Sequence, residues 1–290
     1  MAKTQTREAK RVRVYPPPPA DFDPFTATSK DLMRHGLPSR PDARSQPGMA
    51  ALWERRAARY RHFQHLAPKF DTSKAPAKTI SGIAPAFGPD PTDSCGYQLL
   101  VASATIGALS VTWTVPDLQY TPSALNVDHF HTFIGLGFLD LHVEMTVDAN
   151  QNVTAQLQSP SVAAPINLPV RPGDVLSCVL CLENNERGTA AFFIANETTS
   201  QTINFAADTG FPPAVTVNAG VTRSWSLNQP FPPLARFGAV YFDEISVFTT
   251  GGPRSLTSGQ SITMVGQNGR VLAEPVQLND SAFKTVFVAA

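Results

Sequence analysis

Cysteine and long apolar runs are both scarce in this chain, and each shortage excludes a class of protein. Among 290 residues there are only three cysteines, Cys95, Cys178 and Cys181. So small and odd a number does not build a disulfide framework and is typical of a reducing compartment. No stretch of about 18 apolar residues occurs, so we expect no membrane-spanning helix. The first residues are basic but lack the apolar core of a signal peptide. We therefore expect a cytoplasmic protein, with non-classical export left open.

An excess of either charge is also lacking, because 23 Lys and Arg balance 23 Asp and Glu. The balance hides a split within the chain. Residues 1–90 carry 16 basic and 8 acidic residues, whereas residues 91–290 carry 7 and 15. A basic segment can remain solvated, contact nucleic acid or an anionic surface, or pack on an acidic domain of its own chain. We expect the N-terminal segment to pack on its own acidic domain, and we favour neither a nucleic-acid nor a membrane partner.

Composition divides the chain near residue 92. Residues 1–92 form a basic, Pro-rich extension: residues 16–19 are four prolines, and residues 67–92 are predicted to be a linker rich in Pro, Ala, Gly and Ser. Between them, Pro47 precedes apolar residues at helical spacing, which predicts one helix near 48–64. Residues 1–46 show no repeating pattern and are expected to be coil.

Residues 93–290 have the texture of an all-β domain. Short runs of alternating and β-branched residues are separated by turn residues, with no helical spacing between them, which predicts a β-sandwich or jelly roll. Neither a P-loop nor a G-x-G-x-x-G pattern is present, and we expect no cofactor. The predicted strands are residues 98–103, 109–115, 130–136, 140–147, 175–182, 190–195, 201–205, 222–227, 239–248, 261–265 and 283–288.

A series of short motifs makes the prediction more specific than a fold class. In order, they are 113–116 (WTVP), 133–136 (FIGL), 168–174 (LPVRPGD), 225–230 (WSLNQP) and 234–240 (LARFGAV). With these motifs the segment from 95 to 290 resembles the eqolisins, the glutamic peptidase family, especially its bacterial branch. Residues 13–16, 21–24, 35–42 and 52–55 also resemble the N-terminal segment of that branch. Each motif alone is weak evidence, but their shared order is specific.

The resemblance implies two stacked, strongly bent antiparallel sheets of the eqolisin-like or concanavalin-A-like kind. It also implies acid peptidase chemistry from one Gln and one Glu on the concave face. In that chemistry the Glu is a general base toward water, while the Gln amide holds the water and donates to the developing oxyanion. These two roles suit the two groups, because a carboxylate can accept and release a proton, whereas an amide can only orient the water and donate a hydrogen bond.

The chain departs from the family at both catalytic positions. The Glu of the family motif W-I-x-E-x-P aligns with Asn228, which cannot serve as a base. The catalytic Gln aligns with Asp140, within one or two residues because of a gap. The aromatic, acidic segment of the family is replaced at residues 155–160 (AQLQSP). The resemblance thus keeps the fold motifs and loses the catalytic ones.

Three interpretations of these substitutions stay open. The first is a protein that has lost Gln/Glu catalysis and keeps a concave groove for a peptide or a glycan. The second is an active acid endopeptidase in which Asp140 and Asn228 exchange roles, although a shift of about 1 Å can cost roughly a hundredfold in rate. The third is a metal-binding sandwich. It rests on His129, His131 and His142, because residues two apart on a strand share a face.

Four residues are candidates for binding a ligand in the groove: Phe133, His142, Glu144 and Trp225. Phe133 is expected on the same face as His131. Trp225 lies three residues before Asn228, so both can line one groove only if a bulge or turn intervenes. Outside the groove, the pair Asp243 and Glu244 is expected to be a solvated strand end.

Overall fold

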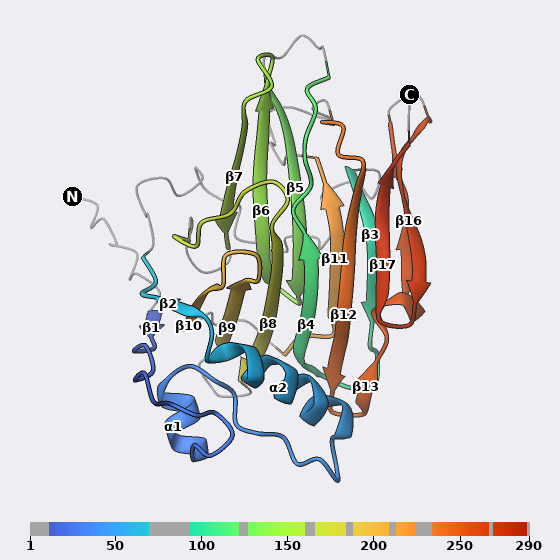
Figure 1. Ribbon diagram of the computed structural model, residues 1–290. Helices are drawn as coiled ribbons and strands as arrows, with labels where there is room; N and C mark the ends of the chain where they lie inside the picture. Colours follow the sequence, from blue (N-terminus) through green and yellow to red (C-terminus); the bar gives the residue numbers. More distant parts are fainter. Residues whose placement is uncertain are drawn as a thin grey trace, which may run out of the picture.

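The computed structural model describes residues 12–69, 93–121, 127–159, 166–183, 188–208, 213–223, 234–266 and 269–288. Two β-sheets are stacked face to face; the helix α2 (Pro47–Tyr60) lies against the outside of the larger one, and the helix α1 (Ser29–Arg34) packs beside α2 (Figure 1). The predicted all-β class is therefore confirmed. No helix in these ranges is both long and apolar enough to cross a membrane.

The larger sheet has 11 strands. Its pairs are antiparallel except for β2 with β10, which is parallel. Beside the main path, β2 (Gln64–Leu66) pairs with β10 and β13 (Gly252–Arg254) pairs with β12. The main path runs β1 (Val12–Val14), β10 (Gln201–Asp208), β9 (Thr189–Asn196), β8 (Val175–Glu183), β4 (Ile106–Thr114), β12 (Ala239–Thr249), β17 (Ala282–Phe287), β16 (Val271–Asn279) and β15 (Met264–Val265).

The smaller sheet has six antiparallel strands and carries the residues singled out from the sequence. Its central strands, β11, β5 and β6, pair over long registers, so the position of every side chain on either face is fixed. The order is β14 (Gln260–Ile262), β3 (Ser94–Leu100), β11 (Thr216–Thr222), β5 (Val127–Leu136), β6 (Leu139–Asp148) and β7 (Val153–Gln158).

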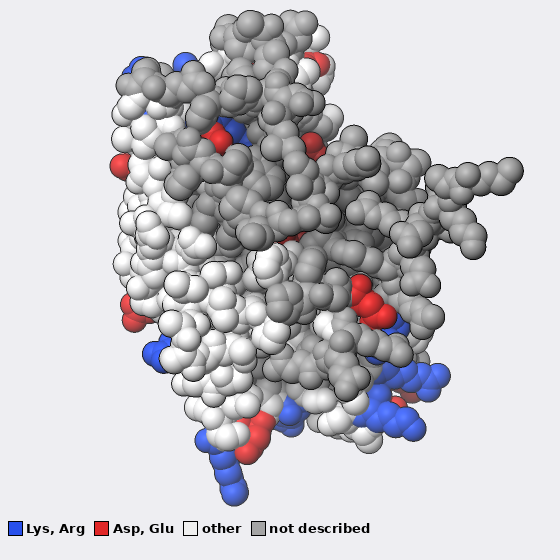
Figure 2. Space-filling view, turned by 180° about the vertical axis from the view of Figure 1, so that it is seen from behind, with Lys and Arg blue, Asp and Glu red and all other residues white. Residues whose placement is uncertain are grey.

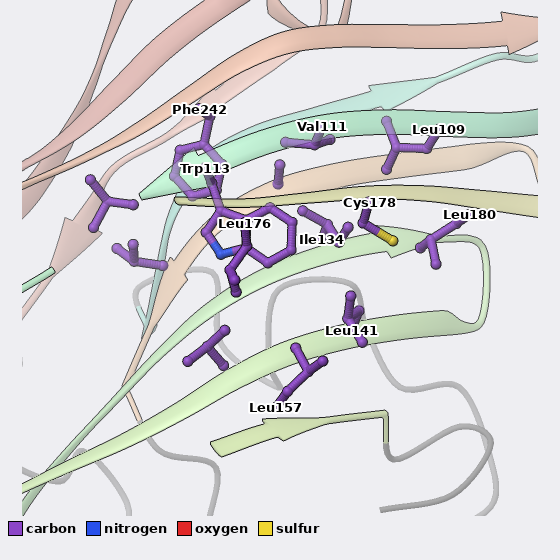
Figure 3. Close-up of a cluster of buried hydrophobic side chains, with 14 of the residues drawn as sticks. Leu109, Val111, Trp113, Ile134, Leu141, Leu157, Leu176, Cys178, Leu180 and Phe242 are labelled. Carbon is purple, nitrogen blue, oxygen red and sulfur yellow. The ribbon is translucent and has the colours of Figure 1, made fainter. Parts of the chain in front are cut away.

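The main hydrophobic core fills the space between the two sheets (Figure 3). Trp113 of β4 is 1% exposed, and its indole Nε1 donates to Thr132 Oγ1 of the other sheet at 3.0 Å. Phe242 stacks on Phe283 with ring centroids 4.7 Å apart. Full burial of a large apolar side chain stabilises the fold by about 1.5–3 kcal/mol. Because strands alternate, the residues between these core positions point to the outer faces.

The N-terminal region is more structured than the coil expected for residues 1–46. It contains β1 and the short helix α1 (Ser29–Arg34), whose first turn is capped by the Thr28 side chain accepting from the Asp31 amide. So short a helix leaves little periodicity to detect, and its cap was the available signal. The helix expected near 48–64 is α2 (Pro47–Tyr60). It ends early because β2 begins at Gln64 and pairs with β10.

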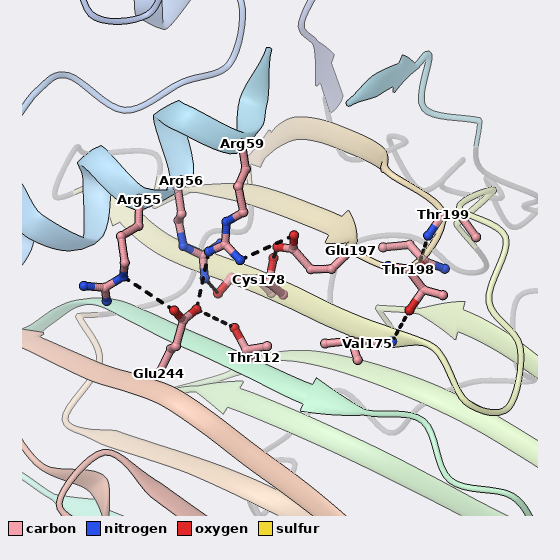
Figure 4. Close-up of polar contacts among 12 residues, drawn as sticks. Arg55, Arg56, Arg59, Thr112, Val175, Cys178, Glu197, Thr198, Thr199 and Glu244 are labelled. Atoms are coloured by element: carbon pink, nitrogen blue, oxygen red, sulfur yellow. Dashed lines mark hydrogen bonds and ion pairs between the residues drawn. The ribbon is translucent and has the colours of Figure 1, made fainter. Parts of the chain in front are cut away.

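The second helix contacts the outer face of the larger sheet (Figure 4). Arg56 donates through Nη2 to Ser110 Oγ at 2.8 Å, and Arg59 lies 3.4 Å from Glu244 and 3.5 Å from Glu197. Glu244 therefore holds the helix, which corrects the expectation of a solvated strand end. A separate apolar cluster joins α1 and α2 through Leu32, Leu37, Trp53, Ala57 and Tyr60.

Several strands differ from the expectations. The strand expected at 222–227 lies outside the described residues from position 224 onward. The strand β11, which ends at Thr222, was not expected. The strand β7 was not expected either, because its two Gln and one Thr dilute the apolar alternation. The strand β16 was not expected either, because Pro275 interrupts its pattern. A short 3-10 helix, η3 (Leu256–Ser258), precedes β14.

Charged side chains are unevenly distributed over the surface (Figure 2). Seen from behind, Lys and Arg gather at the lower end of the molecule, where α1 and α2 lie in Figure 1, while Asp and Glu are scattered. This distribution agrees with the excess of basic residues in the first 90 positions.

Candidate functional site

The side of the smaller sheet that points away from the core carries most of the polar residues proposed from the sequence. On β6, Leu139, Leu141 and Val143 enter the core, so the alternate residues Asp140, His142, Glu144 and Thr146 lie on the opposite side. We call this side the polar face. From β3 to β7 it is formed by Ser94, Gly96, Gln98, Asn218, Gly220, Thr222, His129, His131, Phe133, Gly135, Asp140, His142, Glu144, Thr146, Thr154, Gln156 and Gln158.

The register places the candidate residues in adjacent rows. His131 is paired with Glu144, Phe133 with His142, and Gly135 with Asp140. Paired side chains on one face of antiparallel strands lie about 4.5–5.5 Å apart at Cβ. Phe133 and His131 therefore share a face, and Asp140, His142 and Glu144 face the same side as both.

Two carboxylates on the polar face have hydrogen-bonding neighbours. Asp140 Oδ2 lies 3.5 Å from His142 Nε2, which is an ion pair when the imidazole is protonated. Gln158 Nε2 donates to Glu144 Oε2 at 2.6 Å. Both carboxylates are thus held in place, Asp140 by an imidazole and Glu144 by an amide.

His131 is the most buried titratable group of the polar face, with 7% of its surface exposed. Burial, together with the neighbouring His142 and His129, lowers its pKa to about 3. The His131 and His142 rings meet edge to face with centroids 5.9 Å apart. Within the part of the chain that the structure describes, the Nε2 atom of His131 has no hydrogen-bond partner. His131 is therefore a neutral imidazole at any pH above about 3.

The three histidines do not form a recognisable metal centre. In the part of the chain that the structure describes, no group of three or more His, Cys, Asp or Glu side chains is arranged to hold a metal ion. His129 sits one row beyond His131 and opposite Thr146, away from His142. The polar face brings His131 and His142 together but leaves His129 apart.

Glycines shape the centre of the polar face. A Cβ on Gly96 or Gly220 would lie 2.1 Å from a backbone oxygen of the neighbouring strand, so β3 and β11 can approach this closely only without side chains. Phe133 is paired with Gly220 and Ile262 with Gly96, and these two side chains form a small apolar cluster. The face therefore combines an apolar patch with flanking amide, imidazole and carboxylate groups.

Two of the predicted site residues cannot be placed. Trp225 and Asn228 lie outside the described residues. Conversely, three residues that the register puts on the polar face were not predicted from the sequence: Gln156, Gln158 and Asn218. Gln156 and Gln158 flank the core residue Leu157, so their alternation was the available signal.

The chain is similar to known peptidases. A model of the Peptidase A4 family matches residues 92–286. Among solved structures, Scytalido-glutamic peptidase with a peptide-based transition state analog matches with a TM-score of 0.54 and 16% identity, over 68% of this chain and 98% of that chain. SCP-B, a member of the eqolisin family in a complex with the tripeptide Ala-Ile-His, matches with a TM-score of 0.51, 16% identity and the same coverage.

No curated protein sequence matches this chain. At 16% identity the likeness to the solved structures shows the fold alone. The family model adds the sequence evidence, because it covers both sheets from β3 to β17. The chain therefore belongs to the Peptidase A4 family, the eqolisins, as the resemblance of its motifs predicted.

Proposed function

We propose that this protein binds an extended polypeptide on the polar face and lacks the standard Gln/Glu catalysis of its family. The observation that carries the proposal is the place of Asp140, which lies on the polar face 3.5 Å from His142. The motif alignment puts Asp140 at, or within one or two residues of, the position of the catalytic Gln. An ionised carboxylate accepts hydrogen bonds and cannot donate one to an oxyanion. The substitution of the family Glu by Asn228 removes the base as well.

The rest of the polar face supports binding. Gln156 and Gln158 on β7, and Asn218 on β11, provide amide donors and acceptors on both sides of the histidines. Phe133 and Ile262 provide an apolar contact between them. A polypeptide offers backbone amides and carbonyls at regular spacing together with apolar side chains, so it matches both kinds of group. A glycan stacked on an aromatic ring is the competing ligand. The cytoplasmic location expected from the sequence remains part of this proposal.

Hydrolysis by an altered pair of residues is the second candidate. It is favoured by the two carboxylates that neighbouring side chains hold on the polar face, Asp140 by His142 and Glu144 by Gln158. In this alternative Asp140 acts as the base and Asn228 as the orienting amide. The third candidate is metal binding through His129, His131 and His142, and sensitivity to a chelator distinguishes it.

The test combines binding with turnover on the full chain. Unfolded casein is incubated with the protein from pH 2 to 7, with and without chelator, and binding of unfolded polypeptide and of a glycan panel is measured in parallel. We expect binding of polypeptide without cleavage. Cleavage at acid pH that is unchanged by the chelator would support the second candidate. Cleavage that the chelator abolishes would support the third.

Variants locate the binding. Phe133→Ala and Asp140→Ala should each weaken polypeptide binding about tenfold or more, which corresponds to a loss of about 1.4 kcal/mol. Glu274→Gln, on an exposed position of β16 in the other sheet, is the matched control and should bind as the wild type does. If both polar-face variants bind normally, or if neither polypeptide nor glycan binds, the polar face is not a working site.

A further inference from the structure

A second place in the fold has the features of a ligand site and lies on the far side of the molecule from the polar face. A cavity of about 110 Å³ separates α2 from the outer face of the larger sheet. Apolar side chains dominate its lining, with Leu52, Trp53 and Ala57 from the helix and Val179, Phe193 and Phe248 from the sheet. Three charged side chains also line the cavity: Arg56, Arg59 and Glu197. Arg59 and Glu197 pair with each other at 3.5 Å. Arg56 is partly exposed as a whole residue, but its Nε atom is buried.

The guanidinium of Arg56 meets only neutral acceptors. Its Nη2 donates to Ser110 Oγ at 2.8 Å and to the Cys178 carbonyl oxygen at 3.3 Å (Figure 4). Its Nε is buried and has no hydrogen-bond partner among the described residues. Among the described residues, no carboxylate lies within ion-pair distance of it.

The nearest carboxylates are already engaged by other arginines. Glu244 pairs with Arg55 at 3.5 Å and with Arg59 at 3.4 Å, and Glu197 pairs with Arg59 at 3.5 Å. Burial lowers the pKa of Arg56 and Arg59 lowers it further, while the charges of Glu244 and Glu197 act in the opposite direction. Because both carboxylates are shared with other arginines, Arg56 has no carboxylate of its own, and an anion placed beside it offsets part of the cost of its burial.

The charge of Arg56 and the shape of the cavity together define the class of ligand that fits it. We propose that this cavity binds a short aliphatic carboxylate, with the carboxylate at Arg56 and the apolar tail against Trp53, Val179 and Phe193. Size sets the length of the tail, because an apolar cavity of about 150 Å³ holds a benzene molecule. A cavity of about 110 Å³ is smaller, so a carboxylate of roughly three or four carbons, which has no more heavy atoms than benzene, fits and longer chains do not.

The test titrates the full chain with acetate, butanoate, hexanoate and octanoate at pH 7, by calorimetry and by NMR chemical shifts. We expect butanoate to bind more tightly than acetate, hexanoate or octanoate, and the uncharged butan-1-ol to bind at least tenfold more weakly than butanoate. Equal binding of acid and alcohol would overturn the role of Arg56. No binding by any of these ligands would overturn the site.

Two variants separate charge from shape. Arg56→Met keeps an unbranched apolar stem, so it should erase the preference for acid over alcohol. Val179→Phe fills the cavity and should abolish binding of both. Arg61→Met, just after the last residue of α2, is the matched control and should bind as the wild type does. Retained preference in Arg56→Met, or undiminished binding in a folded Val179→Phe protein, would contradict the proposal. Because the two variants act independently, failure of one to fold leaves the other decisive.

Discussion

Among single residues, His131 shows how burial changes a side chain that the sequence presents as an ordinary histidine. It lies on the polar face between His129 and His142, and its pKa falls to about 3 because the folded protein excludes water from it. In the unfolded chain the same imidazole has a pKa near 6.5. The difference couples the stability of the fold to pH.

The sign of this coupling is definite. Between pH of about 6.5 and 3, the unfolded chain holds a proton on residue 131 that the folded chain does not, so the free energy of unfolding falls as the pH falls. A shift of this size corresponds to a loss of up to about 5 kcal/mol by pH 3. Replacing His131 by Gln removes the titration, so the variant should lose less stability than the wild type between pH 7 and 3.

Urea unfolding at several pH values measures this effect. His62→Gln is the matched control, because His62 is exposed and its replacement should leave the pH dependence unchanged. Identical pH profiles for wild type and His131→Gln would show that residue 131 is not a buried neutral imidazole.

The same residues show how far the sequence predicts the site. A period of two placed His142 and Glu144 on one side of a strand, and that placement needs no knowledge of the partner strands. Gln158 and Asn218 were missed because their position beside Glu144 and Gly135 depends on the pairing of β6 with β7 and of β11 with β5. Pairing is a long-range property, and local periodicity carries no information about it.

Among the elements, β3 and β11 depend on a pair of glycines. Gly96 and Gly220 face each other in register, and a Cβ on Gly220 would lie 2.1 Å from the Cys95 carbonyl oxygen. The obstacle is backbone, so the two strands would have to move apart. We expect Gly220→Ala to lower the free energy of unfolding by about 1–3 kcal/mol or more.

Chemical denaturation of Gly107→Ala supplies the comparison. Gly107 lies in β4, where the nearest atom to an added Cβ is 3.9 Å away and no positive φ is required. Such a change is neutral or stabilises by about 0.4–1 kcal/mol through the unfolded state. Equal stability of the two variants would mean that β3 and β11 are not held as closely as the register requires.

A second element-scale prediction concerns the contact of α2 with β12. Glu244 sits at an irregularity of β12 with a φ of 49°, and it accepts from Thr112 at 3.0 Å. Burial raises its pKa, but the Thr112 hydrogen bond and the charges of Arg59, Arg56 and Arg55 outweigh burial and lower it. The stabilisation is therefore present above the ordinary pKa of glutamate and is lost as the pH falls through the lower folded value.

Glu244→Gln should weaken the docking of α2 at pH 7 by roughly 1 kcal/mol, because the ion pairs are partly exposed. Limited proteolysis measures the effect as faster cleavage within residues 12–69. In strong acid the wild type should approach the variant, since its carboxylate is then neutral as well. Glu274→Gln, on exposed β16, should be cleaved at the wild-type rate under all conditions.

Some strands could be predicted from the sequence and others could not. Long strands with strict alternation, such as β6 and β12, were placed nearly to their ends because half of their residues enter the core. The edge strand β7 and the Pro-containing β16 were missed, because weakly buried strands carry little alternation. β11 was not predicted, since Gly220 interrupts its apolar pattern.

For the whole molecule, the split of charge between the two ends of the chain coincides with a physical contact. The N-terminal segment adds β1 and β2 to the same edge of β10, at residues 205–207 and 201–203, and places α2 over the adjacent strands. An open sheet edge offers unpaired backbone groups to other chains. The segment therefore covers an edge as well as a face of the larger sheet.

Deletion of residues 1–69 should expose that edge together with Val179 and Phe193, so we expect the truncated protein to self-associate and to unfold at a lower temperature. Light scattering measures the association and calorimetry the transition. Deletion of residues 1–11 alone is the control and should change neither, because β1 begins at Val12. A truncated protein that stays monomeric with an unchanged transition would show that the segment contributes nothing to the stability of the sandwich. The charge split would then need a partner outside this chain to explain it.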